Sequence, residues 1–476
     1  MKLVGFFQRL IRLPRQAWRH WLGVMGIIFT TTFAVILVVV FLADFIGFHP
    51  GPYAGIIIYM IVPTGFVVSL IMIPLGGWFA LRKDLKEEPG ERRFPVIDLN
   101  KRGTLQALTT VIVLTIVNVF IIGTATYKGL HYMDTDQFCG KTCHTVMEPE
   151  YTAYSRSPHS RVNCVECHIG PGAPWFVKSK ISGSWQVVSV MFNLYPRPVP
   201  APIESLRPAR ETCEQCHWPA KFHGEQMRIR HRHEVDEENS EVTNVLMMNI
   251  GGISPLSEQY EGIHWHVSPQ VRIKYYAADD KRMEIPYVLV EDDEGRHEEF
   301  LADEDFKLPE HAELRVMDCI DCHNRPTHIY EDPSWAIDEA LQAGRIPPGL
   351  PYSKKVVLQA IKKEYSDKVK ALNGIGEEIR NYYKENGDAD AGLVDRAVEE
   401  AQAIYSNNIF PGMNITWGTY PNHIGHTLSA GCFRCHDEVH ESKEGNVISQ
   451  DCDQCHTLIA MEEEDPEILG ELGIEK

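Results

Sequence analysis

The sequence predicts three N-terminal transmembrane helices followed by a mainly α-helical and irregular domain that contains a small β insertion. Two observations predict this fold class. The long apolar runs all lie within the first 127 of the 476 residues, and all 12 cysteines come later, between Cys139 and Cys455. Residues 1–104 hold 12 Lys/Arg and 6 Asp/Glu, so a basic front precedes an acidic remainder in a chain of net charge −19. Such a chain is neither a disulfide scaffold, which has a cysteine content above about 8%, nor a nucleic-acid binder, whose affinity comes mainly from Lys and Arg.

The three apolar runs cover residues 22–45, 54–81 and 105–127. Each reaches the roughly 20 residues that a helix needs to cross a bilayer, so residues 1–127 are expected to form a membrane domain. Pro63 and Pro74 are compatible with a spanning helix, because neighbouring helices can satisfy the freed backbone groups. A cleaved signal peptide is the alternative for the first run, but that run is longer than the apolar part of a signal, about 7–15 residues.

The basic residues of this front indicate its orientation. They concentrate in residues 1–21 and in the loop 82–104, whereas the loop 46–53 has neither Lys nor Arg. Short loops rich in Lys and Arg stay in the cytoplasm. We therefore expect an inner-membrane protein with a cytoplasmic N-terminus, whose remainder after about residue 128 lies on the periplasmic side.

The cysteines occur in pairs, and each pair is followed directly by a histidine. The five C-x-x-C-H motifs are Cys164/Cys167/His168, Cys213/Cys216/His217, Cys319/Cys322/His323, Cys432/Cys435/His436 and Cys452/Cys455/His456. The first pair in the chain, Cys139 and Cys143 followed by His144, has one additional residue between its thiols. No cysteine is left over.

This motif is the attachment signature of haem c. Two thiols one short turn apart can bond to one porphyrin edge, and the histidine that follows can bind the iron. Zinc sites are the alternative, but they use Cys and His in fours, and neither a redox motif nor a disulfide needs a histidine at that place. The sequence therefore predicts six covalent haem c groups, which agrees with a domain outside the cytoplasm, where haem c is attached.

Electron-transfer haems usually take a second axial ligand, often another histidine. The candidates for this second ligand are His159, His223, His264, His266, His328, His423, His426 and His440. Four further histidines lie in charged, turn-like segments and are interpreted as surface residues: His231, His233, His297 and His311.

Three short stretches resemble the NapC/NirT/NrfH family of membrane quinol dehydrogenases. They are the first motif with Met147 three residues beyond it, Ser-Pro-His at 157–159, and CHNRPTH at 322–328. The resemblance covers about 128–225 and 315–330 and implies a four-haem core.

In this family a methionine just after the first motif is the ligand of the first haem, which implies Met147 here. The family spacing is C-H-x-M, whereas this chain has C-H-T-V-M. Both Met147 and His144 therefore remain candidates, with Met147 favoured.

The resemblance also implies how three core haems are ligated and where a quinol binds. The implied pairs of axial ligands are His168 with His328, His217 with His159, and His323 with His223. For the quinol site it implies a lysine and an acid beside the first haem. The lysine position falls at Lys180, with Lys178 as a near alternative, and the acid position falls at about Val187.

A carboxylate for the quinol site must then come from elsewhere. Glu148 or Glu150 could accept the protons that quinol oxidation releases. Lys178 and Lys180 could instead be lysines that reach toward the membrane surface.

Two segments lie outside this core. The first is an insertion at about 226–314 within the core region 128–330; we expect strands at 264–276 and 285–302, with Asp-Asp-Glu-Gly at 292–295 as a hairpin turn. On such a strand His264 and His266 share a face, and one of them could bind the fifth or sixth haem.

The second segment, 331–476, is expected to hold two amphipathic helices, 353–385 and 389–405, and a two-haem module. His426 and His440 are its candidate axial ligands, with His423 as a spare, and the last 15 residues look like a solvated tail.

The combination resembles, more weakly, inner-membrane multihaem cytochromes of metal-respiring bacteria. These resemblances imply a protein that oxidises menaquinol or another quinol and passes electrons to periplasmic cytochromes or reductases. A terminal reductase of nitrite or hydroxylamine is one alternative, although no C-x-x-C-K motif occurs. A haem subunit of a larger quinol-oxidising complex is another.

Overall fold

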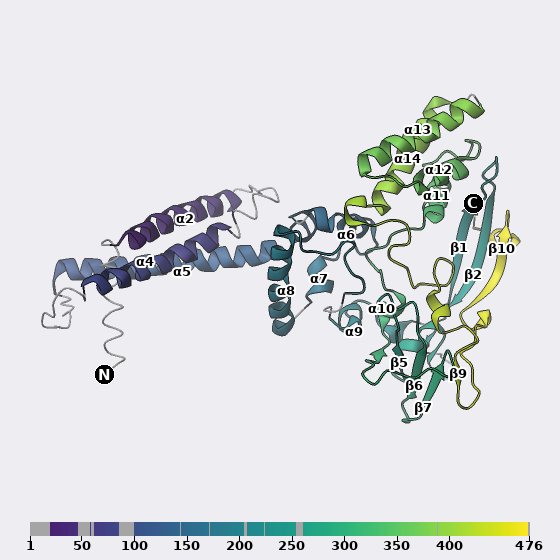
Figure 1. Ribbon diagram of the computed structural model, residues 1–476, viewed down its shortest axis with the longest axis horizontal. Coiled ribbons are helices and arrows are strands. Elements are labelled where there is room, and N and C mark those ends of the chain that lie inside the picture. Colours follow the sequence, from purple (N-terminus) through teal and green to yellow (C-terminus); the bar gives the residue numbers. More distant parts are fainter. Residues whose placement is uncertain are drawn as a thin grey trace. The chain divides into compact units, whose positions relative to one another are not determined.

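The chain divides into two compact units in the computed structural model, Met1–His144 and Thr145–Lys476 (Figure 1). The structure describes residues 20–45, 58, 61–84, 100–142, 144–170, 172–203, 207–222, 224–253, 260–387 and 389–474.

The described part of the first unit contains three long helices: α2 (Trp21–Phe45), α4 (Val62–Asp84) and α5 (Arg102–Met133). The backbones of α2 and α4 touch, because a Cβ added to Gly76 would lie only 2.3 Å from the backbone nitrogen of Gly23. Two stretches, Trp21–Val40 and Val62–Ala80, are long and apolar enough to cross a membrane. The third run predicted to span, 105–127, lies within α5, whose side chains are described only in part.

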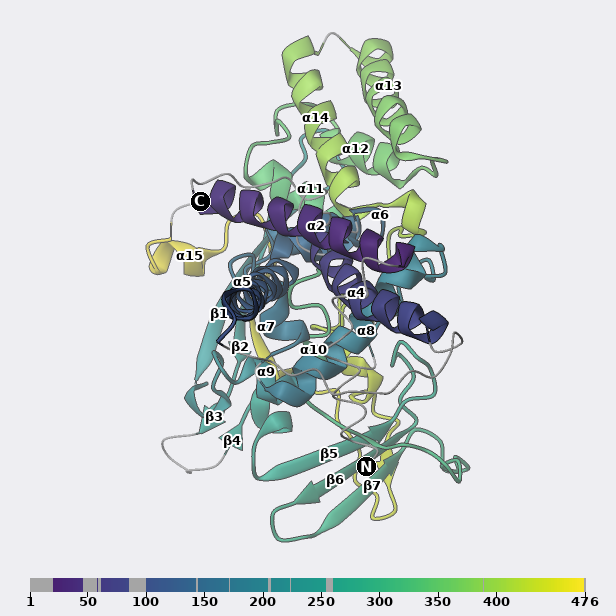
Figure 2. The same ribbon diagram turned by 90° about the vertical axis from the view of Figure 1, so that its left-hand side faces the viewer.

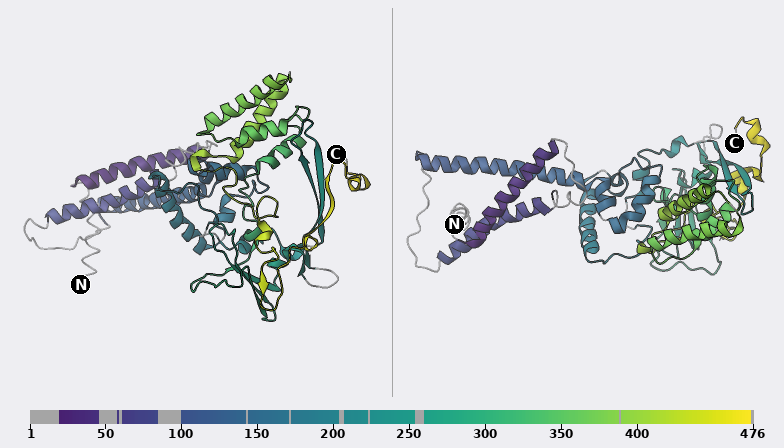
Figure 3. Two further views of the ribbon diagram at one scale, coloured as in Figure 1. Left: turned by 45° about the vertical axis from the view of Figure 1, so that its right-hand side comes forward. Right: turned by 90° about the horizontal axis from the view of Figure 1, so that it is seen from above.

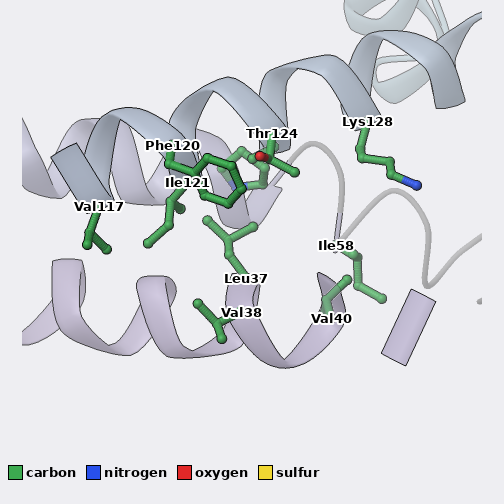
Figure 4. Close-up of a pocket in the computed structure, with 11 residues that line it drawn as sticks. Leu37, Val38, Val40, Ile58, Val117, Phe120, Ile121, Thr124 and Lys128 are labelled. Carbon is green, nitrogen blue, oxygen red and sulfur yellow. The ribbon is translucent and has the colours of Figure 1, made fainter. Parts of the chain in front are cut away.

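An apolar cavity of about 200 Å³ lies between these helices (Figure 4). Its walls are formed by aliphatic and aromatic side chains, among them Leu37 of α2 and Phe120 and Ile121 of α5. Thr124 and Lys128 of α5 contribute the polar groups of the lining. The cavity is therefore largely apolar, and α5 contributes the two polar side chains of its lining.

A cluster of four helices forms the largest apolar core of the second unit. They are α11 (Pro333–Gln342), α12 (Ser353–Lys362), α13 (Lys368–Asn386) and α14 (Ala391–Asn408), seen in green in Figure 1. The single helix predicted at 353–385 is wrong, because Asp367 accepts a hydrogen bond from the backbone N–H of Lys370 and so begins α13 as a new helix. The other predicted helix, 389–405, corresponds to α14.

Two main β-sheets accompany this helical cluster (Figure 2). The three-stranded sheet has the order β1–β2–β10 and the five-stranded sheet the order β8–β5–β6–β7–β9. Their strands are β1 (Glu225–His233), β2 (Glu241–Asn249), β5 (Val271–Tyr276), β6 (Tyr287–Asp292), β7 (His297–Leu301), β8 (Arg315–Val316), β9 (Glu441–Ser442) and β10 (His456–Glu463). A short pair, β3 (Gly252–Ile253) with β4 (Tyr260–Glu261), lies between β2 and β5 in the chain.

The predicted hairpin between β6 and β7 is confirmed, with Gly295 at φ 82° in its turn. The predicted strand at 264–276 is wrong in its first half. Ile263–Val267 is a 3₁₀ turn, η4, and β5 begins only at Val271. Pro269 lies between them and has no N–H to offer a neighbouring strand.

The last part of the chain is built into these sheets. The sequence predicts a separate 331–476 module, but β10 pairs with β2 and β9 pairs with β7, so both sheets are completed by the C-terminal segment (Figure 3). The predicted solvated tail contains α15 (Glu467–Glu471), whose Leu469 is buried against Val245 and Ala460. The unit is therefore mixed helix and sheet rather than mainly α with a small β insertion.

Candidate haem-binding sites

The C-x-x-C-H motifs fold as single helical turns. The turns are α7 (Cys164–His168), the end of α9 (Ala209–Cys213), α10 (Cys319–Cys322), and the 3₁₀ turns η6 (Gly431–Arg434) and η7 (Cys452–Gln454). In α10 the backbone N–H of His323 donates to the carbonyl oxygen of Cys319 at 2.8 Å. The corresponding bonds are 2.8 Å from His217 to Cys213 and 3.1 Å from His436 to Cys432. Such a turn brings both thiols and the histidine of each motif close together.

The first cysteine pair has a wider turn. Phe138–Thr142 is a π-helical turn, η2, which accommodates the additional residue. Cys143 and the side chain of His144 lie outside the described residues. Met147 is half-buried on α6 (His144–Arg156). The choice between His144 and Met147 as iron ligand stays a prediction.

Each of the other five motif histidines faces one further histidine. The ring centres are 6.2 Å apart for His168 and His328, 6.0 Å for His217 and His159, 6.5 Å for His323 and His264, 5.7 Å for His436 and His266, and 6.1 Å for His456 and His426. An imidazole nitrogen binds a first-row metal ion at about 2 Å, so two imidazoles on opposite sides of one ion have ring centres about 6 Å apart. The five pairs match that spacing.

Hydrogen bonds fix which ring nitrogen faces the partner. In five rings Nδ1 donates to a backbone carbonyl: His159 to Pro326 (3.3 Å), His264 to Ile250 (2.9 Å), His266 to Ile263 (2.8 Å), His328 to Glu150 (3.0 Å) and His436 to Ser449 (2.8 Å). A ring that donates through Nδ1 keeps the lone pair of Nε2 for a metal. Consistent with this, the Nε2 atoms of His266 and His436 face each other at 3.5 Å.

The electrostatic surroundings favour neutral imidazoles. Burial lowers the pKa of His168, and the facing His328 lowers it further. Burial likewise lowers the pKa of His266 and of His323, to which the facing His264 adds. A neutral imidazole is the form that binds a metal.

These histidines occur in pairs rather than in larger clusters. Across the described part of the chain, no group of three or more His, Cys, Asp or Glu side chains is arranged to hold a metal ion. A structural zinc site needs four protein ligands, so a pair of histidines alone cannot form one. Two axial nitrogens are what a porphyrin-bound iron lacks, and the cysteines in the described part of the chain form no disulfide. The residues therefore fit haem c, which supplies one-electron redox chemistry when bound.

Thiols of successive motifs lie close together. Burial raises the pKa of Cys167, Cys322 and Cys455, and in each case a thiol of a neighbouring motif adds to the effect. A hydrogen bond with Cys319 is the main cause of the raised pKa of Cys213. The neighbours are Cys167 with Cys216, Cys213 with Cys319, Cys322 with Cys432, and Cys455 with Cys432. The second to sixth motifs thus adjoin one another in chain order.

The structure changes the interpretation of one predicted ligand, His440, and does not describe another, His223. His440 faces no motif histidine among the described side chains, because its Nδ1 is hydrogen-bonded to Asp437 at 2.9 Å and its Nε2 to the carbonyl of Ile285 at 2.6 Å. It therefore ties two chain segments together. His223, predicted to pair with His323, lies outside the described residues, and His264 occupies the place beside His323.

The spare candidate, His423, is buried, and its Nδ1 donates to the carbonyl of Asp321 at 3.3 Å. Its buried Nε2 has no hydrogen-bond partner among the described residues. It is therefore held like the paired histidines, but no ring contact links it to a motif histidine in the described part of the chain.

The residues predicted for a quinol site lie on two helices. Lys178 and Lys180 belong to α8 (Ala173–Met191), with their Nζ atoms 4.7 Å from the ring centre of Trp175 and 5.0 Å from that of Phe176, respectively. Glu148 lies on α6 and forms an ion pair with Lys368 at 3.1 Å. Glu148, one of the two predicted proton acceptors, is thus ion-paired with a lysine of α13.

Comparison with known proteins gives two relatives and one family match. The sequence model of the NapC/NirT cytochrome c family, N-terminal region, matches residues 101–198. The cytochrome c-type protein ImcH of Geobacter sulfurreducens is 41% identical over 437 residues, which are 90% of this chain and 86% of that protein. This chain belongs to the NapC/NirT family of c-type cytochromes.

A second relative in the family is the cytochrome c-type protein NrfH of Wolinella succinogenes, 26% identical over 122 residues, or 25% of this chain and 68% of that protein. No solved structure matches the chain. Membership confirms the predicted resemblance and makes the chain a membrane-anchored electron-transport protein with covalently bound haem c. The haem motifs and the three short stretches predicted this family; the pairing of His264 with His323 carries no signal in the sequence.

Proposed function

We propose that this cytochrome carries six haem groups, takes electrons from menaquinol in the membrane and delivers them to a periplasmic cytochrome or reductase. The observation that carries the proposal is the set of five histidine pairs. Each pair lies at a haem motif, and the thiols of successive motifs adjoin one another. Bound haem supplies the one-electron chemistry. The chain contributes the paired imidazoles that hold each iron and the spacing between neighbouring groups.

The same pairs favour electron transfer over substrate reduction. A terminal reductase of nitrite or hydroxylamine needs an iron with an open coordination position. In the proposed ligand set the pairs His168/His328, His217/His159 and His456/His426 would each hold one iron by two histidines, and His264 and His266 would complete two more pairs. The first haem, with His144 or Met147, is then the single place for chemistry other than electron transfer, and we assign it to the quinol.

Quinol oxidation releases two electrons and two protons and leaves a quinone, so the site needs a group that accepts or relays protons. Helix α8 supports a position at the membrane surface, because Ile181 is 69% and Trp185 63% exposed beside Lys178 and Lys180. These lysines could bind the quinol oxygens. We also propose that α5 is a third span and that the N-terminus is cytoplasmic.

Purified protein in detergent, given a reduced menaquinol analogue, tests the function. Mass spectrometry of the intact chain should first show six haem additions. We expect the haem spectrum to become reduced without added subunits. If no haem is reduced, the chain is instead a haem subunit that depends on a separate quinol oxidase, and rapid turnover of hydroxylamine or nitrite would favour the reductase.

Variants locate the quinol site. Lys180→Met, alone and with Lys178→Met, should lower the rate of quinol-driven haem reduction about tenfold or more, as loss of a proton-transfer group does. Lys307→Met, at an exposed loop lysine, is the matched control. Ala125→Phe fills the cavity between α2, α4 and α5; a selective loss of rate in that variant would move the site there and contradict the assignment to α8.

A further inference from the structure

Two histidines only two residues apart face two different haem motifs. The ring of His264 lies parallel to that of His323 in the fourth motif, with an angle of 7° between the planes. His266 faces His436 in the fifth motif, with an Nε2–Nε2 distance of 3.5 Å. The 3₁₀ turn η4 explains this divergence, because with three residues per turn the side chains of i and i+2 point about 120° apart. On a strand they would share one face.

The turn is held in place from both ends. At its start, Gly251 and Gly262 cross so closely that a Cβ on Gly251 would lie 1.7 Å from the carbonyl oxygen of Glu261. Both glycines have positive φ angles, 74° and 70°, which favour glycine. The crossing brings the carbonyl of Ile250 to Nδ1 of His264. At its end, the guanidinium of Arg210 donates to the carbonyl of Val267.

The fourth and fifth motifs are also bonded to each other directly. Arg434, inside the fifth motif, donates to the carbonyl oxygen of Asp321, inside the fourth, at 2.7 Å. The same guanidinium reaches the carbonyl of Arg282 at 2.8 Å and is almost fully buried.

The carboxylate of Asp321 ties the fourth motif to the five-stranded sheet. It accepts hydrogen bonds from Tyr275 of β5 (2.7 Å), from Arg282 (2.9 Å) and from Arg315 of β8 (2.7 Å). The side chain is 2% exposed. Buried hydrogen bonds therefore join the two motif turns to each other and to the sheet of the insertion.

We infer that His264 and His266 are the distal ligands of the fourth and fifth haems, and that this turn and the Arg434–Asp321 bond make the two haems one closely coupled pair. The inference rests on the six-haem occupancy proposed above. The inference also assigns a role to the insertion, which would supply one ligand to each of two neighbouring irons. It also replaces His223, the ligand that the family resemblance implies for the fourth haem.

Spectroscopy of the full chain in detergent tests the assignment. His264→Ala and His266→Ala should each retain six haem additions by mass and convert one low-spin haem signal to high-spin in electron paramagnetic resonance. Because an alanine variant could fail to mature, His266→Met keeps a ligand at that position and should replace a single bis-histidine signal with a histidine–methionine signal. His297→Ala, an exposed histidine on β7 of the same insertion, is the control and should change none.

The coupling has a separate readout. Arg434→Gln should alter the spin–spin interaction of one pair of haems and leave the remaining signals unchanged. If His223→Ala rather than His264→Ala produces the high-spin haem, or if all six haems stay low-spin in both alanine variants, the ligand assignment is overturned. Fewer than six haems in the unchanged protein would count against the proposed function instead.

Discussion

Individual imidazoles in this cytochrome are oriented by groups that the motifs do not contain. His328 lies against Glu150, whose backbone carbonyl is 3.0 Å from Nδ1, and Glu150 is itself held by Arg325 at 3.2 Å and Tyr330 at 3.3 Å. Arg325 in turn lies over the ring of Tyr420. Such outer partners orient a ligand and raise its basicity. Glu150, considered from sequence as a proton acceptor for quinol, is thus engaged in positioning a histidine.

Asp321 provides a stability prediction at this scale. Asp321→Ala leaves the guanidinium groups of Arg282 and Arg315 without their buried carboxylate. Breaking a buried ion pair on one side costs about 3–5 kcal/mol. Thermal unfolding followed by circular dichroism in the haem band should show a clearly lower midpoint. Asp293→Ala, in the exposed β6–β7 turn, should shift the midpoint little; equal shifts would argue against a special role for Asp321.

His423 predicts a pH dependence. Its pKa is lowered to about 4, mainly by burial and also by the nearby charge of Arg434. Arg282 opposes protonation as well, whereas Asp321 favours it. A histidine in the unfolded chain has a pKa of about 6.5. Above pH 6.5 His423 is neutral in both states, and its burial then makes its full contribution to the stability of the folded state. This contribution is lost as the pH falls from about 6.5 toward 4.

The His423→Asn variant keeps a side-chain N–H donor near the position of Nδ1 but does not titrate. The drop in its unfolding midpoint between pH 6.5 and 4.5 should therefore be smaller than that of the unchanged protein. His311→Asn, at an exposed position, should follow the unchanged protein. An identical pH profile for His423→Asn would contradict the prediction.

At the scale of elements, the sequence predicted what is local and missed what is tertiary. The C-x-x-C-H turns and the β6–β7 hairpin follow from spacing and turn residues within a few positions. The break before α13 depends on one cap, Asp367, within a continuously amphipathic stretch. The pairing of β10 with β2 joins segments about two hundred residues apart, and exposed residues dominate β10, so alternation could not reveal it. The histidine partners are likewise chosen by tertiary contacts.

Strand β10 follows the last motif directly, so its packing should affect the sixth haem. Leu469 of α15 is 5% exposed and packs with Ala460 of β10 and Val245 of β2. Leu469→Ala should cost about 2–5 kcal/mol locally. We expect faster amide hydrogen exchange in β10 and α15. Leu472→Ala, 53% exposed just beyond α15, is the matched control and should leave exchange unchanged.

For the molecule as a whole, the distribution of charge bears on its partner. Net charge is −19 although the first 104 residues are basic, so the domain after them is strongly acidic, and haem propionates add to this. Charges of one sign on a surface steer partners of the opposite sign. The proposed acceptor should therefore present a basic patch around its own redox group.

This expectation is measurable as a salt dependence. The second-order rate of electron transfer from the reduced protein to a basic periplasmic cytochrome should fall steeply between about 0.01 M and 0.15 M ionic strength, as the Debye length shortens from about 30 Å to 8 Å. An acidic cytochrome of similar size is the control, and its rate should rise. A rate that does not change with salt would exclude electrostatic docking.

One long-range histidine pair has a consequence for maturation of the protein. His266 and His436 are separated by 170 positions, and His168 and His328 by 160. A chain exported from its N-terminus presents Cys164 and Cys167 for haem attachment before His328 has crossed the membrane. Among the five pairs only His168 has a partner that comes later in the chain, so the second haem would wait with one ligand missing until His328 arrives. Export and assembly of that site would thereby be coupled, and a chain truncated before His328 would carry one haem able to react with oxygen or other small molecules.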